Sequence, residues 1–514
     1  MGKYNTSYKF TGLLEAIALL SIIALASYLR LNNIETNPGW YTDETTHVII
    51  AQNLLDGRVQ YLAVTDSFLL FARLPLFQYT LAATMALLGE GLLSLRILTG
   101  GLGIVTVGLV YALVRQITHE RWLALAAAFS LAVYPTAIIY SRVGFSYALL
   151  TPLILIAVWG LANYTLHRSR IGLAVAALAT GLGLISDLMI GTMIPVIGLT
   201  VLVTNWRDLF WSMPLCALPF GGYTGYMLLT RPEIFLFDLQ FTVSRLSTMT
   251  LDEQIQNVID NYEIVLTENL WITLGLIGLF LIRQPHLRAL SLLAFLLPVG
   301  MLARTVALYH LSFYYLIPLL PIPMIGVGAL LVYGSQRLHA SVMTLPLPQR
   351  PIKWALGTML AIMIIWMPVA AITNRTWNET ETGFETDIDA FLINPADGNA
   401  IADFINARVT EDNIVIGSVP FLWDLDAQVT DYQPQAAWAG METVHIPADL
   451  PRERYAFDPS FDQAKFIIVD NLWRFWGEVH VDGVLEMSWE LQNSWELVFE
   501  AGDIQVYQNP ALSD

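Results

Sequence analysis

Two adjacent carboxylates, Asp43 and Glu44, stand just after a long apolar run and open a segment with helical spacing. Ionised groups at the edge of a membrane are costly and are usually kept for function. An Asp close to a hydroxyl can act as a general base, with Glu44 as its orienter or as a second carboxylate. The structural alternative makes Asp43 the N-cap of a helix and Glu44 its first-turn dipole partner.

A histidine follows this acidic pair at helical spacing. His47 lies four residues after Asp43, so the two side chains share a helical face and could bind a divalent cation such as Mg²⁺ or Mn²⁺. Asp-x-x-x-His is a weak metal signal, and a polar loop histidine is the commoner use of such a residue. The sequence leaves the need for a metal open.

Four arginines form a second group with chemical potential, because a planar guanidinium grips phosphate bidentately. They lie on the side of the apolar runs where basic residues are disfavoured. Each could instead reach toward lipid headgroups. Among other acids, Asp187 marks the end of an apolar run, and Asp238 and Glu263 lie in a long loop. The four arginines are Arg73, Arg96, Arg142 and Arg304.

The composition indicates that these residues are positioned by a membrane body. The chain has 514 residues, of which 55% are hydrophobic and 13% charged, whereas soluble domains carry about 25% charged residues. Its one cysteine, Cys216, rules out an internal disulfide and a cysteine-based zinc site. Nothing in the composition suggests nucleic-acid binding.

Apolar runs of roughly 20 residues predict membrane spans. The segment 75–88 has only 14 residues, and we expect a juxtamembrane or re-entrant helix there. The first run, near the amino terminus, has no small-residue cleavage site and is typical of a signal anchor. About eleven spans are predicted, near 11–29, 95–114, 122–140, 147–166, 171–188, 190–204, 209–229, 269–282, 287–303, 308–333 and 354–373.

The basic clusters predict the orientation of these spans. With a cytoplasmic amino terminus, nearly all of them face inward, as the positive-inside rule requires; a crossing at 75–88 would turn most of them outward. We therefore expect a multi-pass protein of the plasma membrane, with the loops 31–94, 141–147 and 230–268 on the outer face. The inward residues are Arg115, Arg121, Arg168, Arg170, Arg207, Arg283, Arg288, Arg337, Arg350 and Lys353.

The end of the chain has the composition of a soluble domain. From residue 378 onward it holds 26 Asp and Glu against 5 Lys and Arg, so the tail is acidic and the remainder mildly basic. We predict a membrane domain at 1–374 and an extracellular or periplasmic α/β or α+β domain at 375–514. Its expected elements are a helix at 397–409, strands at 413–419 and 465–470, and a hairpin of 495–500 with 504–507.

Several motifs resemble those of GT-C class membrane glycosyltransferases. The aromatic-x-Asp-Glu pattern at 41–44 is most similar to the protein O-mannosyltransferase and lipid A aminoarabinose transferase group, the dolichyl-phosphate-mannose-protein mannosyltransferase-like family. Further likenesses follow in the family's order. They are Arg73-Leu74-Pro75-Leu76 for basic-Pro-Pro-Leu, Gly89-Glu90 with Ser94-Leu95-Arg96, Ser141-Arg142, and Phe313 to Pro321 for Arg-Tyr-x-x-Pro-x-x-Pro.

The resemblance implies a GT-C type, α-helical polytopic fold and sugar transfer, with inversion, from a polyprenyl-phosphate donor to an acceptor hydroxyl on the outer face. It implies Asp43 as the base with Glu44 beside it, and donor-phosphate binding by Arg73, Arg96, Arg142 and Arg304. Substrate contacts are expected from Tyr41, His47, His310 and Tyr315. The acceptor is left open among protein, lipid and glycan.

Two positions depart from the family pattern. Tyr147 stands where the family often has a second acid, and Tyr314 stands where it has an Arg, which His310 or Arg304 could replace. The alternative function is a transporter or lipid flippase whose path is lined by the acidic pair and the arginines. A third reading makes the spans an anchor for a partner-binding tail. Within that tail, Trp473 and Trp476 near Arg474 could stack on sugars, although core packing is the commoner use.

Overall fold

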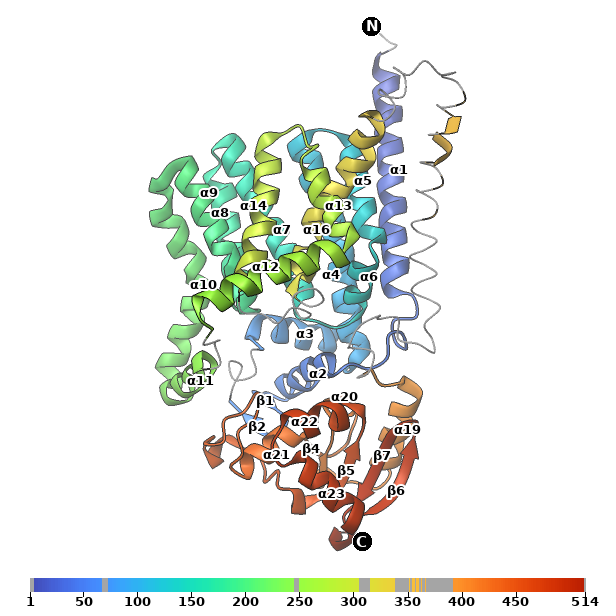
Figure 1. The fold of residues 1–514 in the computed structure, drawn as a ribbon, viewed down its shortest axis with the longest axis vertical. Coiled ribbons are helices and arrows are strands. Elements are labelled where there is room, and N and C mark those ends of the chain that lie inside the picture. Colours follow the sequence, from blue (N-terminus) through green and yellow to red (C-terminus); the bar gives the residue numbers. More distant parts are fainter. Residues whose placement is uncertain are drawn as a thin grey trace.

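The protein is a helical bundle with a smaller unit, built around a five-stranded sheet, at one end (Figure 1). The computed structural model describes residues 4–66, 73–244, 249–304, 315–337 and 392–512, with some residues between 351 and 366. The amino terminus lies at the end of the bundle opposite to this tail unit (Figure 1). The expected domain boundary at 374/375 lies outside the described residues, so that division stays a prediction.

The long apolar runs form the helices of the bundle. Pro135 ends one of them, because a proline has no N–H to continue the ladder, and the chain bends by 58° between α5 and α6. The helices are α1 (Tyr4–Leu31), α4 (Leu92–Thr118), α5 (Arg121–Val133), α6 (Pro135–Arg142), α7 (Tyr147–His167), α8 (Arg170–Leu184), α9 (Met193–Asn205), α10 (Leu209–Thr230), α13 (Leu270–Leu279), α14 (Pro285–Ala303) and α16 (Pro321–Ala329).

Six helices of the described chain are long and apolar enough to cross a membrane, and eight if each bent pair is one span. Three of the eleven predicted spans are not among these eight, each for a different reason. α8 is apolar but has only 15 residues. The two predicted spans 190–204 and 209–229 fall in one stretch, Leu188–Thr230, which has 43 residues and is counted as a single span. One crossing needs only about 20 residues, and the short turn η2 (Trp206–Asp208) divides the stretch in two. The last, 354–373, lies almost wholly outside the described residues.

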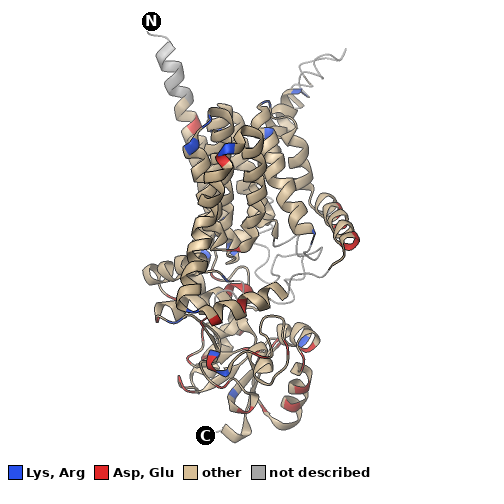
Figure 2. Cartoon of the chain, turned by 90° about the vertical axis from the view of Figure 1, so that its left-hand side faces the viewer, with Lys and Arg blue, Asp and Glu red and all other residues tan. Residues whose placement is uncertain are grey.

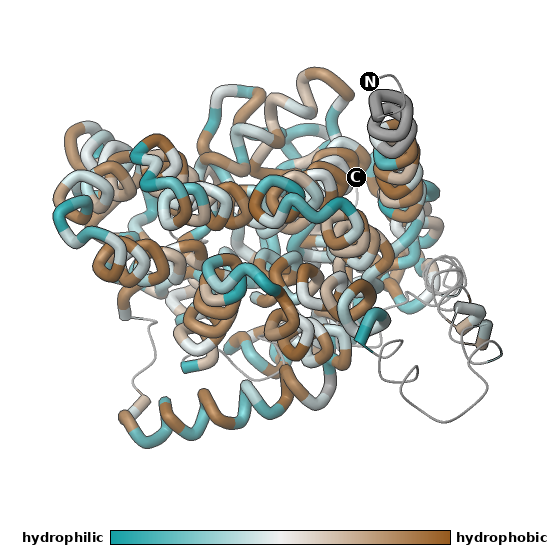
Figure 3. The backbone as a smooth tube through the Cα atoms, turned by 90° about the horizontal axis from the view of Figure 1, so that it is seen from above, coloured by the Kyte–Doolittle hydropathy of each residue, from teal (hydrophilic) through white to brown (hydrophobic). Residues whose placement is uncertain are grey.

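Charge and hydropathy are distributed as a membrane body requires. Lys, Arg, Asp and Glu gather toward the two ends of the bundle and in the tail, and its middle is nearly free of them (Figure 2). α12 (Leu251–Glu268) runs across the outside of the bundle and alternates hydrophilic with hydrophobic stretches (Figure 3). It exposes Leu251, Ile255 and Ile259, as a helix lying in the membrane interface does.

Two shorter helices lie across the tail end of the bundle rather than along it (Figure 1). α2 (Thr42–Leu55) ends at Leu55 with Asp56 as its C-cap, and Gly57 follows with a φ of +76°. α3 (Pro75–Leu88) has proline in its first turn, where the missing N–H costs nothing, and ends at Gly89. α3 therefore does not cross the bundle, as expected from its length. The short hairpin of β1 (Gln60–Tyr61) and β2 (Val64–Thr65) between them was not predicted.

The tail sheet has the order β4-β3-β5-β7-β6, with β3 parallel to both β4 and β5. The predicted strands, helix and terminal hairpin are confirmed, and β4 and the short helices were missed. Most of β5 is buried, as its apolar sequence predicts. The elements are α19 (Pro395–Asn406), β3 (Ile414–Ile416), α20 (Val419–Leu422), β4 (Gln428–Thr430), α21 (Tyr432–Trp438), β5 (Ala464–Val469), η10 (Trp473–Gly477), α22 (Glu478–His480), α23 (Val484–Ser494), β6 (Glu496–Ala501) and β7 (Ile504–Gln508).

The tail and the first loop share one hydrophobic core. Phe466 and Ile468 of β5 belong to the same buried cluster as Val48 of α2 and Phe77 of α3. Trp40 pairs with Ile393 in a β-bridge, which Gly39 permits because a Cβ there would lie 2.3 Å from the Ile393 carbonyl oxygen. The tail therefore holds the loop that carries the acidic pair.

Candidate active site

Asp43 and Arg73 form an ion pair at the tail end of the bundle. An Arg73 Nη lies 2.6 Å from an Asp43 carboxylate oxygen, and the two side chains are 20% and 35% exposed, respectively. Asp43 stands in the first turn of α2, whose N-cap is Tyr41 without a side-chain cap bond, so the capping role is not what the structure shows. This pair places a carboxylate, which can accept a proton, beside a guanidinium, which can bind an anion, and both side chains are partly exposed.

Glu44 faces the other way and is fully enclosed. Its carboxylate accepts hydrogen bonds of 2.8 Å from Arg96 Nε, from an Arg96 Nη and from the backbone N–H of Gly144. Gly144 can approach so closely because a Cβ there would lie 2.3 Å from the Leu95 side chain. Glu44 therefore ties α2 to α4 and to the loop before α7.

Two arginines expected to bind donor phosphate have protein partners in this structure, and their role toward a donor stays a prediction. The remaining N–H groups of Arg96 donate to the carbonyls of Ile34, Glu35, Pro38 and Gly39. The guanidinium of Arg142 donates to the carbonyls of Leu29, Asn32, Asn33 and Asn37. Both side chains are buried, so they shape the start of the first loop from within.

The remaining expected residues are only partly brought together. Tyr315 precedes η4 (Ile317–Leu319), and its ring lies 5.9 Å from that of Tyr147. Arg304 is exposed at the end of α14, and the described residues offer its side chain no hydrogen bond or ion pair with Asp43 or Arg73. His310 and Tyr314 lie outside the described residues.

Arg73 is the centre of a polar cluster drawn from five elements. Burial opposes its charge, but the negative charge of Asp43, with Tyr147, Tyr61 and Asp187, outweighs burial and raises the pKa of the guanidinium. Asp187 follows α8, and burial raises the pKa of its carboxyl to about 6 against a hydrogen bond from Met189 N–H and the charge of Arg73. The backbone N–H of Leu76 donates to the carbonyl of Ile185, which fixes the loop of Asp187 against α3.

His47 and Tyr41 pack around this cluster and provide no metal site. His47 is buried, its Nδ1 lies 2.6 Å from Gln78 Nε2, and its ring meets Phe77 edge-on. The Tyr41 ring lies 5.7 Å from that of Phe145. Within the described part of the chain no three His, Cys, Asp or Glu side chains gather in a way that could hold a metal ion. Because Asp43 contacts Arg73 and His47 contacts Gln78, the residues present do not fit a divalent cation.

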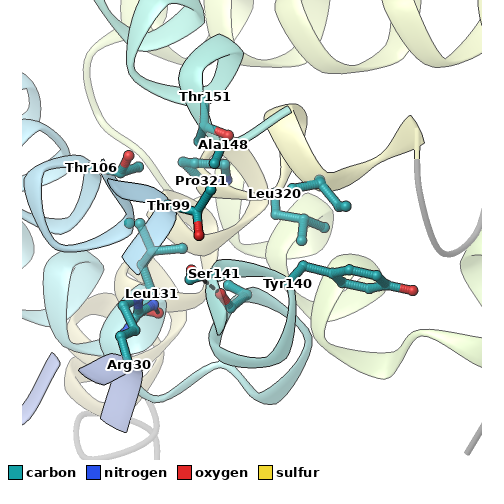
Figure 4. A pocket seen from close by; sticks show the side chains of 13 residues that line it. Arg30, Thr99, Thr106, Leu131, Tyr140, Ser141, Ala148, Thr151, Leu320 and Pro321 are labelled. Carbon is teal, nitrogen blue, oxygen red and sulfur yellow. Dashed lines mark hydrogen bonds between the residues drawn. The ribbon is translucent and has the colours of Figure 1, made fainter. Parts of the chain in front are cut away.

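A cavity within the bundle is lined by Arg30, an arginine that the sequence did not single out (Figure 4). The cavity has a volume of only about 30 Å³, and Thr99, Ser141 and Thr151 line it with hydroxyls. Arg30 is buried and donates to the carbonyls of Leu131 and Ala132, at the end of α5 where Pro135 breaks the ladder. Its place at the end of an apolar run gave no signal, because such arginines commonly reach toward headgroups.

Comparisons with known proteins agree with this architecture. Residues 72–234 match the family model for dolichyl-phosphate-mannose-protein mannosyltransferase. The match includes Arg73, Arg96 and Arg142 and begins after Asp43. No protein among the curated sequences matches the chain.

Solved structures match almost the whole chain. ArnT from Cupriavidus metallidurans in the apo state gives a TM-score of 0.66 at 14% identity, covering 98% of this chain and 99% of that one. The same protein bound to undecaprenyl phosphate gives 0.58 at 14% identity, covering 96% and 98%. The archaeal oligosaccharyltransferase AglB from Archaeoglobus fulgidus gives 0.50 at 10% identity, covering 98% and 75%. The expected likeness to the GT-C glycosyltransferases, and the polytopic fold that it implies, are confirmed.

Proposed function

We propose that this integral membrane protein is a glycosyltransferase that moves a sugar from a polyprenyl-phosphate donor to an acceptor hydroxyl, at the end of the bundle that carries the tail. The observation that carries the proposal is the Asp43–Arg73 pair, which joins a base to a phosphate-binding cation in one accessible place. The fold supports it, since the similar structures include one titled as ArnT bound to undecaprenyl phosphate.

In the proposed reaction Asp43 takes the proton of the acceptor hydroxyl. The acceptor oxygen attacks the anomeric carbon from the side opposite to the phosphate, and the bond from that carbon to the phosphate oxygen breaks. The electron pair leaves with the polyprenyl phosphate, so the configuration at the anomeric carbon inverts. Asp43 ends protonated and returns its proton to solvent, which its exposed fraction of 35% allows.

Arg73 would bind the donor phosphate and stabilise the charge that develops on it as it leaves. Without donor, Arg73 is held by Asp43 at 2.6 Å. A phosphate that takes the guanidinium would release the carboxylate to act as a base, so donor binding would prepare the site for the acceptor. Arg96 and Arg142 would act indirectly, since their N–H groups already bind Glu44 and loop carbonyls.

Asp187 would supply the second carboxyl of the site. Tyr147 occupies the position where the family often has an acid, and Tyr147 and Asp187 both interact electrostatically with Arg73. Burial raises the pKa of Asp187 to about 6, so part of its population carries a proton near neutral pH. A protonated Asp187 can donate a hydrogen bond to a phosphate oxygen or to a sugar hydroxyl, a role that Tyr147 can share.

The test incubates the purified protein in lipid with a panel of polyprenyl-phosphate sugars and measures the release of polyprenyl phosphate. We expect release from at least one donor and a fall of about 100-fold or more in Asp43→Asn, because general-base catalysis contributes about 10²–10⁴-fold. Asp56→Ala is the matched control, since Asp56 lies at the other end of α2 and its exposed side chain pairs with Arg58. It should react at the wild-type rate.

Two results would overturn the proposal. If the Asp43→Asn variant turned over donor as fast as the wild type, Asp43 would not be the general base. No release from any donor by well-folded protein would favour the transporter or flippase, in which the pair and the arginines line a path.

A further inference from the structure

A hollow on the tail, remote in sequence from the Asp43 cluster, combines polar side chains with an exposed aromatic ring. It lies between η10, α22 and α23 on one side and β5 and β7 on the other. Its volume is about 240 Å³, smaller than the pockets of about 300–1,000 Å³ that hold drug-sized ligands, so it suits a small ligand such as a single ring. The residues that matter are Arg474, Phe475, Glu478, Ser488, Gln492 and Gln505.

One wall of the hollow is fixed by hydrogen bonds before any ligand arrives. Arg474 donates to the carbonyl of Asp503 at 2.7 Å and to Gln505 Oε1 at 2.9 Å. Gln505 Nε2 donates in turn to Glu500 at 2.7 Å. The guanidinium therefore orients the Gln505 amide, and its two terminal nitrogens are already engaged.

The helical side of the hollow also holds a fixed carboxylate. Ser488 Oγ lies 2.6 Å from Glu478 Oε1 and accepts the indole N–H of Trp473 at 2.9 Å. Trp473 is fully buried and meets Tyr432 edge-on, so it belongs to the core rather than to a binding surface. The chain Trp473–Ser488–Glu478 anchors the carboxylate to the core of the tail.

Phe475 gives the hollow an apolar platform. The ring is 63% exposed, whereas an aromatic side chain on a soluble surface is stabilised by burial. The neighbouring amide of Gln492, on α23, is exposed as well. A flat apolar face beside a carboxylate and two amides matches a ligand with one face of C–H groups and a rim of hydroxyls.

Other classes of ligand fit less well. An anion would meet the Glu478 carboxylate and an arginine whose terminal N–H groups are engaged. A metal ion would find a single carboxylate among these lining residues. A purely apolar ligand would leave Glu478, Gln492 and Gln505 without water, which is unfavourable for buried polar groups.

We propose that this hollow is a binding site for a neutral sugar ring. The ring stacks its C–H face on Phe475, and its hydroxyls donate to Glu478 and exchange hydrogen bonds with Gln492 and Gln505. The site is separate from the Asp43 cluster and does not depend on the proposed reaction. It would retain a glycan at the tail through contacts that involve no bond making or breaking.

Saturation-transfer NMR on the full chain in lipid nanodiscs, with neutral methyl glycosides of the common hexoses as probes, tests the site. A single-ring site of this kind binds weakly, with a Kd on the order of 1 mM. We expect transfer to the ring protons of at least one glycoside, and a fall of about threefold or more in Phe475→Ala, because an aromatic contact of about 0.5–1.5 kcal/mol is lost. Glu478→Gln should weaken transfer as well.

The controls separate this site from the reaction and from folding. Val479 follows Glu478 on α22; its side chain is 68% exposed and does not line the hollow. The variant Val479→Ala should therefore bind the glycoside as the wild type does. Asp43→Asn should also leave transfer intact. No transfer from any glycoside, equal transfer in Phe475→Ala, or transfer lost in Asp43→Asn would each overturn the proposal.

Discussion

Two neighbouring carboxylates, Asp43 and Glu44, have opposite environments. The Asp43 side chain keeps 35% of its surface exposed and meets an arginine that is itself 20% exposed. Glu44 and its partner Arg96 expose none. A helix turns by about 100° per residue, so adjacent side chains point to different faces. One face of α2 therefore meets the ligand side, and the other holds the helix to the bundle.

Glu44→Gln should destabilise the protein, whereas Asp43→Asn should not. Removing one charge leaves Arg96 buried without its counter-ion, and breaking a buried pair costs about 3–5 kcal/mol. The apparent unfolding temperature in detergent should therefore fall clearly in Glu44→Gln. Glu90→Gln, which changes an exposed acid at the same end of the bundle, is the control. Equal unfolding temperatures for the wild type and Glu44→Gln would contradict a structural role.

Asp431 should give the tail a pH-dependent stability. Burial raises the pKa of its carboxyl from 3.8 to about 7, against one hydrogen bond from the Gln433 N–H. Because the folded pKa is raised, the folded state retains a proton that the unfolded state has lost. The contribution of this carboxyl to the free energy of unfolding is therefore largest below pH 4. It is lost as the pH rises to about 7, and the loss amounts to about 4 kcal/mol because the pKa differs by about three between the two states.

Asp431→Asn tests this directly, because an amide oxygen can still accept from Gln433 and cap α21. The variant should unfold at a higher temperature than the wild type at pH 8 and at a similar temperature at pH 4. Asp426→Asn, at an exposed position, should leave the dependence of the unfolding temperature on pH unchanged. If the unfolding temperature of Asp431→Asn changed with pH as that of the wild type does, the Asp431 carboxyl would not titrate as described.

At the scale of elements, the tail acts as a clamp on the first loop. Arg454 binds both oxygens of Asp238 on α11 (Pro232–Ser244), at 3.1 and 3.3 Å, and both side chains are nearly buried. The same arginine donates from Nε to the carbonyl of Thr65, and Tyr455 forms a β-bridge with Val64. The hairpin of β1 and β2 is thus held between the tail and α11.

Arg454→Ala should loosen this hairpin. The substitution removes the counter-ion of buried Asp238, a change that costs about 3–5 kcal/mol, and it removes the bond to Thr65. Hydrogen exchange of residues 58–65 should become faster, while exchange in α4 stays unchanged. Arg452→Ala is the matched control, because Arg452 is exposed and its guanidinium lies over the ring of Trp438, within the tail, and donates to the Trp438 carbonyl. Unchanged exchange in Arg454→Ala would show that the clamp lies elsewhere.

The sequence predicted elements better than it predicted partners. Periodicity located α2, α3 and the hairpin of β6 and β7, because the residues that specify these elements are local. It did not predict the protein partners of Arg96 and Arg142, because a guanidinium that binds carbonyls of the first loop looks the same in sequence as one that binds phosphate. The contribution of Asp187 depends on a loop fixed by Leu76 and Ile185, a contact across more than 100 residues that no local pattern contains.

At the scale of the whole molecule, exposed arginines without a carboxylate partner among the described residues are more numerous at the amino-terminal end of the bundle than at the tail end. On the tail side Arg73, Arg96 and Arg231 are each paired with a carboxylate. At the other end Arg115 and Arg170 are also paired, with Glu15 and Asp208. Arg168, Arg207 and Arg283 are exposed there and form no ion pair with a carboxylate of the described residues, and the same holds for Arg304 on the tail side. Figure 2 shows the bands of charge at both ends. Unneutralised arginines near span ends favour the cytoplasmic side, so the amino-terminal end of the bundle should face the cytoplasm and the tail the outside.

Cysteine labelling tests this orientation, because the chain's one cysteine, Cys216, is buried and should give little background. Asn493→Cys places a thiol on the exposed surface of the tail, and His167→Cys places one at the last residue of α7, which is also exposed. A membrane-impermeant maleimide added to intact cells should label the first variant and reach the second only after permeabilisation. The reverse pattern would place the Asp43 cluster on the cytoplasmic side, and the proposed donor and acceptor would then have to be sought there.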